Sequence, residues 1–184
     1  MTEPLNRRTA LALLAAGVVP FRLQAAQKQL RALQTGVEPK LIFLDEAAHR
    51  LVDALCEAII PTDDHSPGAH AARVSYYIDL VLGNSPVEAQ EAWRAGMAAL
   101  ERLANKQLGK SFVDAGGGAR TAFLNQLAGP SITATPERDF FARIKQMTIS
   151  GYYTSEIGLL KELGYKGNQA IAEFPGCNTP PGET

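Results

Sequence analysis

The chain has 184 residues and a formal net charge of −1; 46% of its residues are hydrophobic and 20% are charged. This composition is ordinary for a globular protein, and the length is sufficient for one domain with a buried core. The sequence contains no basic run interleaved with aromatic residues, which excludes the usual signature of nucleic-acid binding.

The first 26 residues are typical of a targeting segment. Arg7 and Arg8 precede an apolar run, ALALLAAGVV, which Pro20 closes. A run of about ten apolar residues is too short to span a bilayer but suits the hydrophobic region of a signal peptide. Paired arginines before such a run resemble a twin-arginine export signal. We therefore expect an export leader over residues 1–26 and a periplasmic location; an ordinary amphipathic N-terminal helix is the alternative.

The segment that follows the leader is expected to be a linker. It covers residues 27–44 and ends by docking on a helical domain that we place at residues 45–178. Asp45 is expected to cap the first helix of this domain, because apolar residues from Ala48 to Ile59 follow at helical spacing.

Pro61 is expected to end that first helix, and a polar loop follows over residues 62–68. The apolar spacing then predicts a second helix from about Ala69 to Leu82. For the third helix, Ser85 is the expected N-cap and Glu88 the residue that closes a capping box. Its buried side should carry Trp93, Met97, Leu100 and Leu103, and Gly109 lies near its end.

The remaining elements are also predicted to be helical. The glycines at 116–118 are expected to form a flexible turn before a short helix that ends near Leu127. Thr135 and Pro136 then begin a helix with Phe140, Phe141, Ile144 and Met147 facing inward, and Thr154 or Ser155 caps a last one through Leu163. The chain is therefore predicted to be all-α, a single domain of about six helices with an extended C-terminal tail, of which residues 179–184 are flexible.

Catalytic and metal-binding patterns are sparse. Glu46 and His49 form an E-x-x-H pair on one helix face, as in di-iron proteins, but the sequence has no second such pair. His65 and His70 flank an acidic loop, so an independent metal-dependent enzyme built on these four residues is one alternative. No nucleophile elbow, dinucleotide fingerprint or haem-attachment motif is present. We expect no catalytic, cofactor-binding or metal site in this chain.

Aromatic and glycine-rich stretches near the C-terminus are typical of a surface that another protein covers, since tyrosine combines a large rigid ring with a polar tip. The alternative is that one tyrosine ring packs inward and the other caps a helix end. The expected contact residues are Tyr152, Tyr153, Thr154, Glu156, Phe174 and Pro175.

The two cysteines, Cys56 and Cys177, are too few for a disulfide framework. One disulfide between them is an alternative if the chain leaves the cytoplasm; two independent thiols, with Cys56 in the core, is the other.

The segment 55–62 (LCEAIIPT), the closing motif 151–158 (GYYTSEIG) and the stretch from Tyr165 to Cys177 together resemble the gluconate 2-dehydrogenase subunit 3 family. The resemblance covers residues 40–178. It implies an accessory subunit that binds a large, FAD-carrying catalytic subunit of a sugar, polyol or glycoside dehydrogenase and supplies the export signal for the pair. It also implies that electrons pass on to a cytochrome c or a quinone through other subunits. A solitary periplasmic binding protein remains an alternative.

Overall fold

The computed structural model describes residues 39–130 and 134–167, and the elements of these two ranges are helices without a β-strand. This confirms the all-α prediction. The elements are α3 (Glu46–Ile59), α4 (Gly68–Ala71), α5 (Val74–Gly83), α6 (Val87–Leu108), α7 (Gly117–Ala128), α8 (Pro136–Tyr153) and a π-helix, η1 (Ile157–Glu162). None of the helices in the described part has both the length and the apolar character that crossing a bilayer requires.

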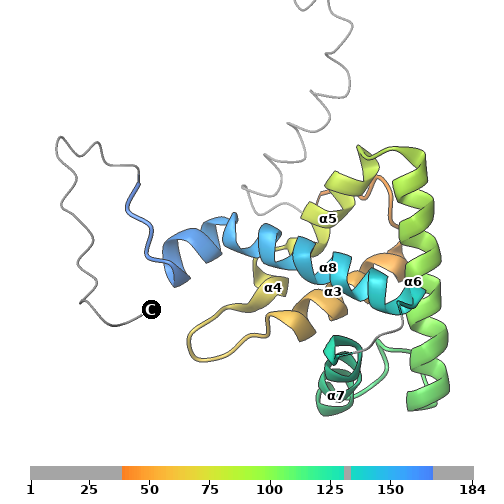
Figure 1. Ribbon diagram of the computed structural model, residues 1–184. Coiled ribbons are helices and arrows are strands. Elements are labelled where there is room, and N and C mark those ends of the chain that lie inside the picture. Colours follow the sequence, from red (N-terminus) through yellow and green to blue (C-terminus); the bar gives the residue numbers. More distant parts are fainter. Residues whose placement is uncertain (1–38, 131–133, 168–184) are drawn as a thin grey trace, which may run out of the picture.

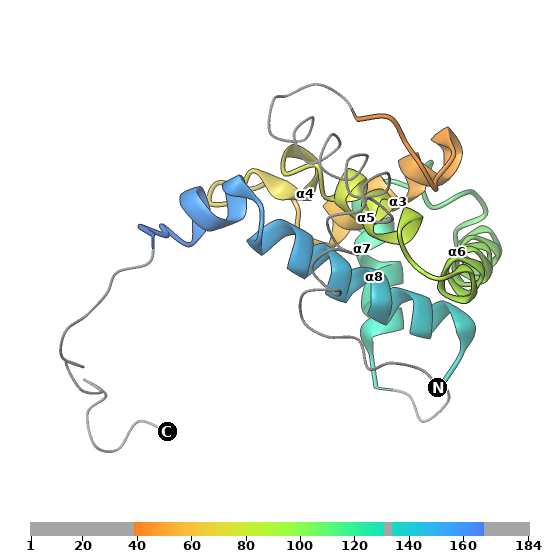
Figure 2. The same cartoon turned by 90° about the horizontal axis from the view of Figure 1, so that it is seen from above.

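Helix α8 is the centre of the assembly. It crosses the long helix α6 and also packs on α3, α5, α7 and η1 (Figures 1 and 2). The crossing with α6 is close because a Cβ atom on Gly96 would lie only 2.7 Å from the Cβ of Phe140. The ring of Phe140 meets Trp93 edge to face, with 4.9 Å between centroids, so aromatic packing reinforces the crossing.

One continuous hydrophobic core lies beneath α8. Its largest fully buried apolar side chains are Phe112, Leu55, Ile78, Leu100, Ile144, Val52 and Val74, together with Tyr152. Cys56 is buried there as well, and the Thr148 hydroxyl donates to its sulfur over 3.3 Å. Burial raises the pKa of the Cys56 thiol to about 12, so the sulfur behaves as a small neutral core group.

The segment that enters the domain is held by one buried carboxylate. Asp79 is only 2% exposed, and it accepts hydrogen bonds from the backbone N–H groups of Ile42 at 2.8 Å, Phe43 at 3.0 Å and Leu44 at 2.7 Å. Leu44 is buried directly after this clamp, and Asp45 then caps α3 by accepting from the Ala48 N–H over 2.7 Å. The chain before α3 is thus docked on α5.

Three local predictions require correction. The expected helix from Ala69 to Leu82 is divided into α4 and α5, because Arg73 adopts a left-handed conformation with φ of 56°. The capping box before α6 does not form: Pro86 occupies the N-cap position, and the Ser85 hydroxyl donates to the carbonyl of Val81. The glycine turn is shorter than expected, since α7 already begins at Gly117.

Candidate functional site

The closing motif of the sequence builds the junction between α8 and η1. A Cβ atom on Gly151 would lie 2.6 Å from the Tyr77 ring, so the glycine allows α8 to approach α5. A Cβ atom on Gly158 would lie only 2.2 Å from the carbonyl oxygen of Tyr152, so this glycine allows η1 to approach the end of α8. Both glycines are therefore required for close packing.

The sequence predicts Tyr152 as a contact residue for a partner, but the structure buries it within this chain. Its side chain is 0% exposed and belongs to the core, which corresponds to the alternative that one tyrosine ring packs inward. Its hydroxyl lies 2.7 Å from the Ser66 hydroxyl, 86 positions earlier in the chain. Burial, followed by the neighbouring Glu162, raises the pKa of Tyr152 above its usual range, so its hydroxyl is neutral and either hydroxyl of the pair can donate.

The residues after Tyr152 fix the direction of η1. The Tyr153 hydroxyl donates to Glu162 over 2.8 Å, and this hydrogen bond is the main reason why the pKa of Tyr153 is raised. Ser155 confirms the predicted cap, because its hydroxyl oxygen accepts from the Gly158 N–H over 3.1 Å. Thr154 and Glu156 are exposed.

The opening motif forms a second fixed structure beside this junction. Glu57 accepts from both the backbone N–H and the hydroxyl of Thr62, each over 2.8 Å, and from the His70 N–H over 2.9 Å. Gly68 has φ of 80°, and a Cβ atom there would lie 2.5 Å from the Thr62 hydroxyl. Only glycine fits this backbone position without strain.

The loop at residues 60–67 brings the two motifs together. Asp63 accepts from the backbone N–H groups of His65 and Ser66, which hold the pKa of its carboxyl below the usual range. Ser66 in turn accepts from the Gly68 N–H over 3.2 Å and contacts the Tyr152 hydroxyl. The opening and closing motifs are therefore parts of one structure that supports the base of η1.

We define residues 157–165 as the C-terminal arm. In both views this segment extends beyond the other helices (Figures 1 and 2, blue). Three of its apolar side chains face solvent: Leu160 is 52% exposed, Leu163 58% and Tyr165 43%. Ile157, at its start, packs partly against the core. This surface could not be predicted from the apolar spacing alone, which indicates a helix for Leu160 and Leu163 but does not show what lies opposite them.

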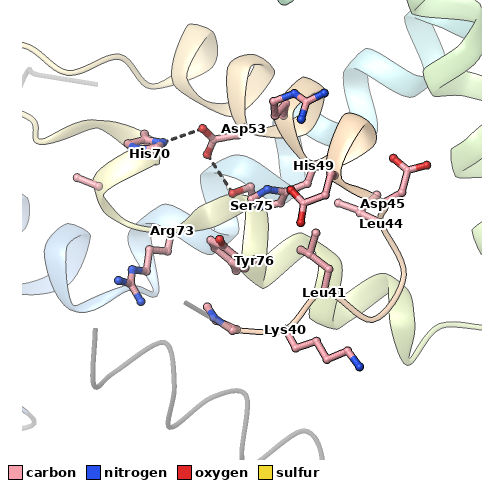
Figure 3. Close-up of a pocket in the computed structure, with 14 residues that line it drawn as sticks. Lys40, Leu41, Leu44, Asp45, His49, Asp53, His70, Arg73, Ser75 and Tyr76 are labelled. Atoms are coloured by element: carbon pink, nitrogen blue, oxygen red, sulfur yellow. Dashed lines mark hydrogen bonds and ion pairs between the residues drawn. The ribbon is translucent and has the colours of Figure 1, made fainter. Parts of the chain in front are cut away.

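A separate cavity of about 840 Å³ opens between the segment 39–45, α3 and the start of α5 (Figure 3). The side chain of Asp53 lies at its wall, 2.7 Å from His70 Nδ1, and accepts from the Ser75 hydroxyl over 3.0 Å. Here the carboxylate stands between the serine and the histidine. A nucleophilic triad requires the histidine in that position, so this arrangement links α3 to α4 and α5 without activating Ser75.

The four residues of the metal-enzyme alternative do not converge. Glu46, His49 and His70 line the cavity, whereas His65 lies in the exposed loop. Within the described ranges, no group of three or more histidine, cysteine or acidic side chains is placed to hold a metal ion. His49 instead packs its ring on Tyr76 at 4.4 Å. The proposed ligand set is therefore wrong.

Several predicted functional residues lie outside the described residues. They are Arg7 and Arg8 of the leader, Phe174 and Pro175 of the expected interface, and Cys177. Cys56 is a free thiol in the structure, in agreement with the alternative of two independent cysteines. Its pairing with Cys177 remains a prediction.

Comparison with known proteins gives one family. The sequence model described as Gluconate 2-dehydrogenase subunit 3 matches residues 46–176. This range spans the helical body, both motifs and the C-terminal arm. No curated protein and no solved structure matches the chain.

Proposed function

Because the chain belongs to the gluconate 2-dehydrogenase subunit 3 family, we propose that it is a non-catalytic accessory subunit of a periplasmic sugar, polyol or glycoside dehydrogenase. It binds and stabilises an FAD-containing catalytic subunit and accompanies this subunit during export. Electrons then pass to a cytochrome c or a quinone through other subunits. The complex can associate with the membrane through those subunits. The family match over residues 46–176 is the observation that carries the proposal.

Two features of the chain support the details of this role. The pair Arg7–Arg8 before an apolar run resembles a signal for the export of folded proteins, which would let the flavin be inserted before transit. The C-terminal arm offers exposed apolar side chains, and a subunit that travels with a partner needs an interface with apolar anchors.

Co-expression tests the escort role. The catalytic subunit is produced with and without this chain, and flavin-dependent sugar oxidation is measured in the periplasmic and cytoplasmic fractions. We expect periplasmic activity only when the chain is present. The variant Arg7→Lys/Arg8→Lys should keep the complex in the cytoplasm, whereas Arg22→Lys serves as a control within the same leader. Arrival of the catalytic subunit in the periplasm without this chain would show that the escort role is wrong.

The cavity beside α3 favours a second candidate, a solitary periplasmic binding protein. Its volume of about 840 Å³ lies within the range of small-molecule sites, and polar side chains such as His49 and Asp53 line it. Calorimetric titration of the purified full chain with gluconate, glucose and fructose separates the two candidates. Binding of one sugar by the chain alone would support the binding protein. No heat, combined with co-purification of a flavoprotein, would support the accessory subunit.

A further inference from the structure

The exposed apolar surface of the described residues is concentrated on the C-terminal arm. Six large hydrophobic side chains are well exposed in this part of the chain, and Leu160, Leu163 and Tyr165 lie within six consecutive positions. Isolated exposed apolar residues are ordinary, but a cluster on one short element marks an interaction site.

The C-terminal arm is too short to be stable without contacts to the rest of the domain. η1 has six residues, and its principal helix contact is α8. Helices of this length are not stable in water by themselves, and π-helical geometry is rare. The arm is nevertheless closed by backbone hydrogen bonds from Leu163 to Gly158 at 3.0 Å and from Tyr165 to Leu159 at 2.9 Å. Its conformation is therefore imposed from its base.

The base of the arm is rigid. Gly158 lets η1 pack directly against the carbonyl of Tyr152, and the Ser155 hydroxyl caps the first turn of η1. The hydrogen bond from Tyr153 to Glu162 connects η1 to the end of α8. The Tyr152–Ser66 contact joins this base to the opening motif. A surface held in one orientation loses little entropy when it binds, which favours a separate chain as its partner.

We propose that the C-terminal arm is the docking element for the catalytic subunit, with Leu160, Leu163 and Tyr165 entering an apolar groove on that subunit. Two exposed lysines, Lys161 and Lys166, lie beside these side chains, against one exposed carboxylate, Glu162, which accepts from the Tyr153 hydroxyl. This excess of positive charge predicts an acidic rim on the groove. This inference rests on the proposed function. It adds the surface, the anchor residues and the chemistry of the partner's site.

The test is co-purification of the full-length complex. Tagged chain is co-expressed with the FAD-containing catalytic subunit, and bound flavin and sugar-dehydrogenase activity are measured per mole of chain over a dilution series. We expect Leu160→Ser/Leu163→Ser to weaken retention by about tenfold per side chain, as for interface anchors. The matched control Val81→Ser/Val87→Ser removes two exposed apolar side chains elsewhere and should stay within about twofold of wild type.

Two further variants test the orientation of the arm and its coverage by the chain's own tail. Gly158→Ala keeps every apolar side chain but displaces η1, since the new Cβ would overlap the Tyr152 carbonyl; retention should fall although circular dichroism shows a folded chain. Truncation after Gly167 tests whether the tail covers the arm. A rise in binding of a hydrophobic dye to the isolated truncated chain, abolished by Leu160→Ser/Leu163→Ser, would overturn the proposal in favour of the tail.

The outcomes for the inference and for the proposed function differ. If wild-type chain retains the flavoprotein and Leu160→Ser/Leu163→Ser retains it equally, the docking inference is wrong and the accessory role stands. If wild-type chain retains no flavoprotein, the accessory role itself is wrong. Loss of retention with Leu160→Ser/Leu163→Ser and with Gly158→Ala, but not with the control, supports the arm as the docking element.

Discussion

Replacement of Asp79 by asparagine should strongly destabilise the domain. The carboxylate accepts three backbone hydrogen bonds, from Ile42, Phe43 and Leu44, in a site that is almost closed to water. Hydrogen bonds to a charged group contribute about 1.5–3 kcal/mol each. Asparagine has the same size but only one acceptor oxygen, and its NH₂ group would face at least one N–H donor.

The expected loss follows from these contacts. The Ile42 N–H bonds one carboxylate oxygen, and the Phe43 and Leu44 N–H groups bond the other. In Asp79→Asn, the donors that face the new NH₂ group lose their acceptor, and the other hydrogen bonds are then made to a neutral oxygen instead of a carboxylate. Together these losses destabilise the fold by about 3 kcal/mol. For a chain of this length, that loss lowers the melting temperature by about 6–12 °C.

Urea denaturation of the full chain, followed by circular dichroism, measures this loss. Asp114→Asn is the matched control, because that carboxylate is exposed and accepts from the Ser111 hydroxyl. The control should change the unfolding free energy by less than about 0.5 kcal/mol. If Asp79→Asn unfolds at the same urea concentration as the control, the carboxylate does not hold the entering segment, and our account of how residues 42–44 dock is wrong.

Three other predictions concern the core. Tyr152→Phe removes the buried hydroxyl that contacts Ser66 and should lower the unfolding free energy by about 1–2 kcal/mol in the same urea assay. In the variant Cys177→Ser, where Cys56 is the one remaining cysteine, the thiol should not react with Ellman's reagent at pH 8. Rapid labelling would contradict the burial of Cys56. Because burial raises the pKa of this thiol from 9.0 to about 12, its contribution to stability is complete below pH 9 and is lost as the pH rises from 9 to 12. Urea denaturation over that pH range measures this loss. Gly96→Ala should lower the unfolding free energy by about 1–3 kcal/mol, because the new Cβ overlaps α8. The control Gly116→Ala has open space around it and should be neutral or stabilising. Equal effects of the two substitutions would show that the α6–α8 crossing is looser than described.

Much of the helical architecture could be predicted from the sequence because local signals agree with the fold. Asp45 caps α3, Pro61 follows its end, Pro136 opens α8 and Gly109 ends α6 with φ of 70°. Each of these residues acts through the backbone of its own helix terminus. Such effects depend on a few neighbouring positions and are therefore visible in a single sequence.

The division between α4 and α5 could not be predicted in this way. A left-handed conformation at Arg73 costs about 1–2 kcal/mol for a residue with a side chain, so local preference favours one uninterrupted helix. The change of direction is compatible with long-range contacts, because it lets His70 and Ser75 both reach Asp53 on α3. Tertiary contacts outweigh local propensity here, and the sequence does not show them.

The orientation of Tyr152 was undetermined for a different reason. A tyrosine suits both a core with one polar partner and an interface, so its identity alone does not separate the two. The decision depends on Ser66, which supplies a hydroxyl from a loop 86 positions away. In contrast, the role of Asp79 has a signal in the sequence: a carboxylate within the apolar run of α5 must find hydrogen-bond donors.

The opening and closing motifs, which resemble the family, have structural roles in this chain, and this affects where binding residues should be sought. Gly151 and Gly158 allow close packing, Tyr152 fills the core and Ser155 caps η1. These residues make their contacts within the chain and are poorly placed to contact a partner. Their combined effect is to hold a short arm whose exposed residues, such as Leu160, are chemically ordinary. The two motifs therefore locate the support of the proposed docking surface, and the surface itself is found only from the exposure of the residues that this support carries.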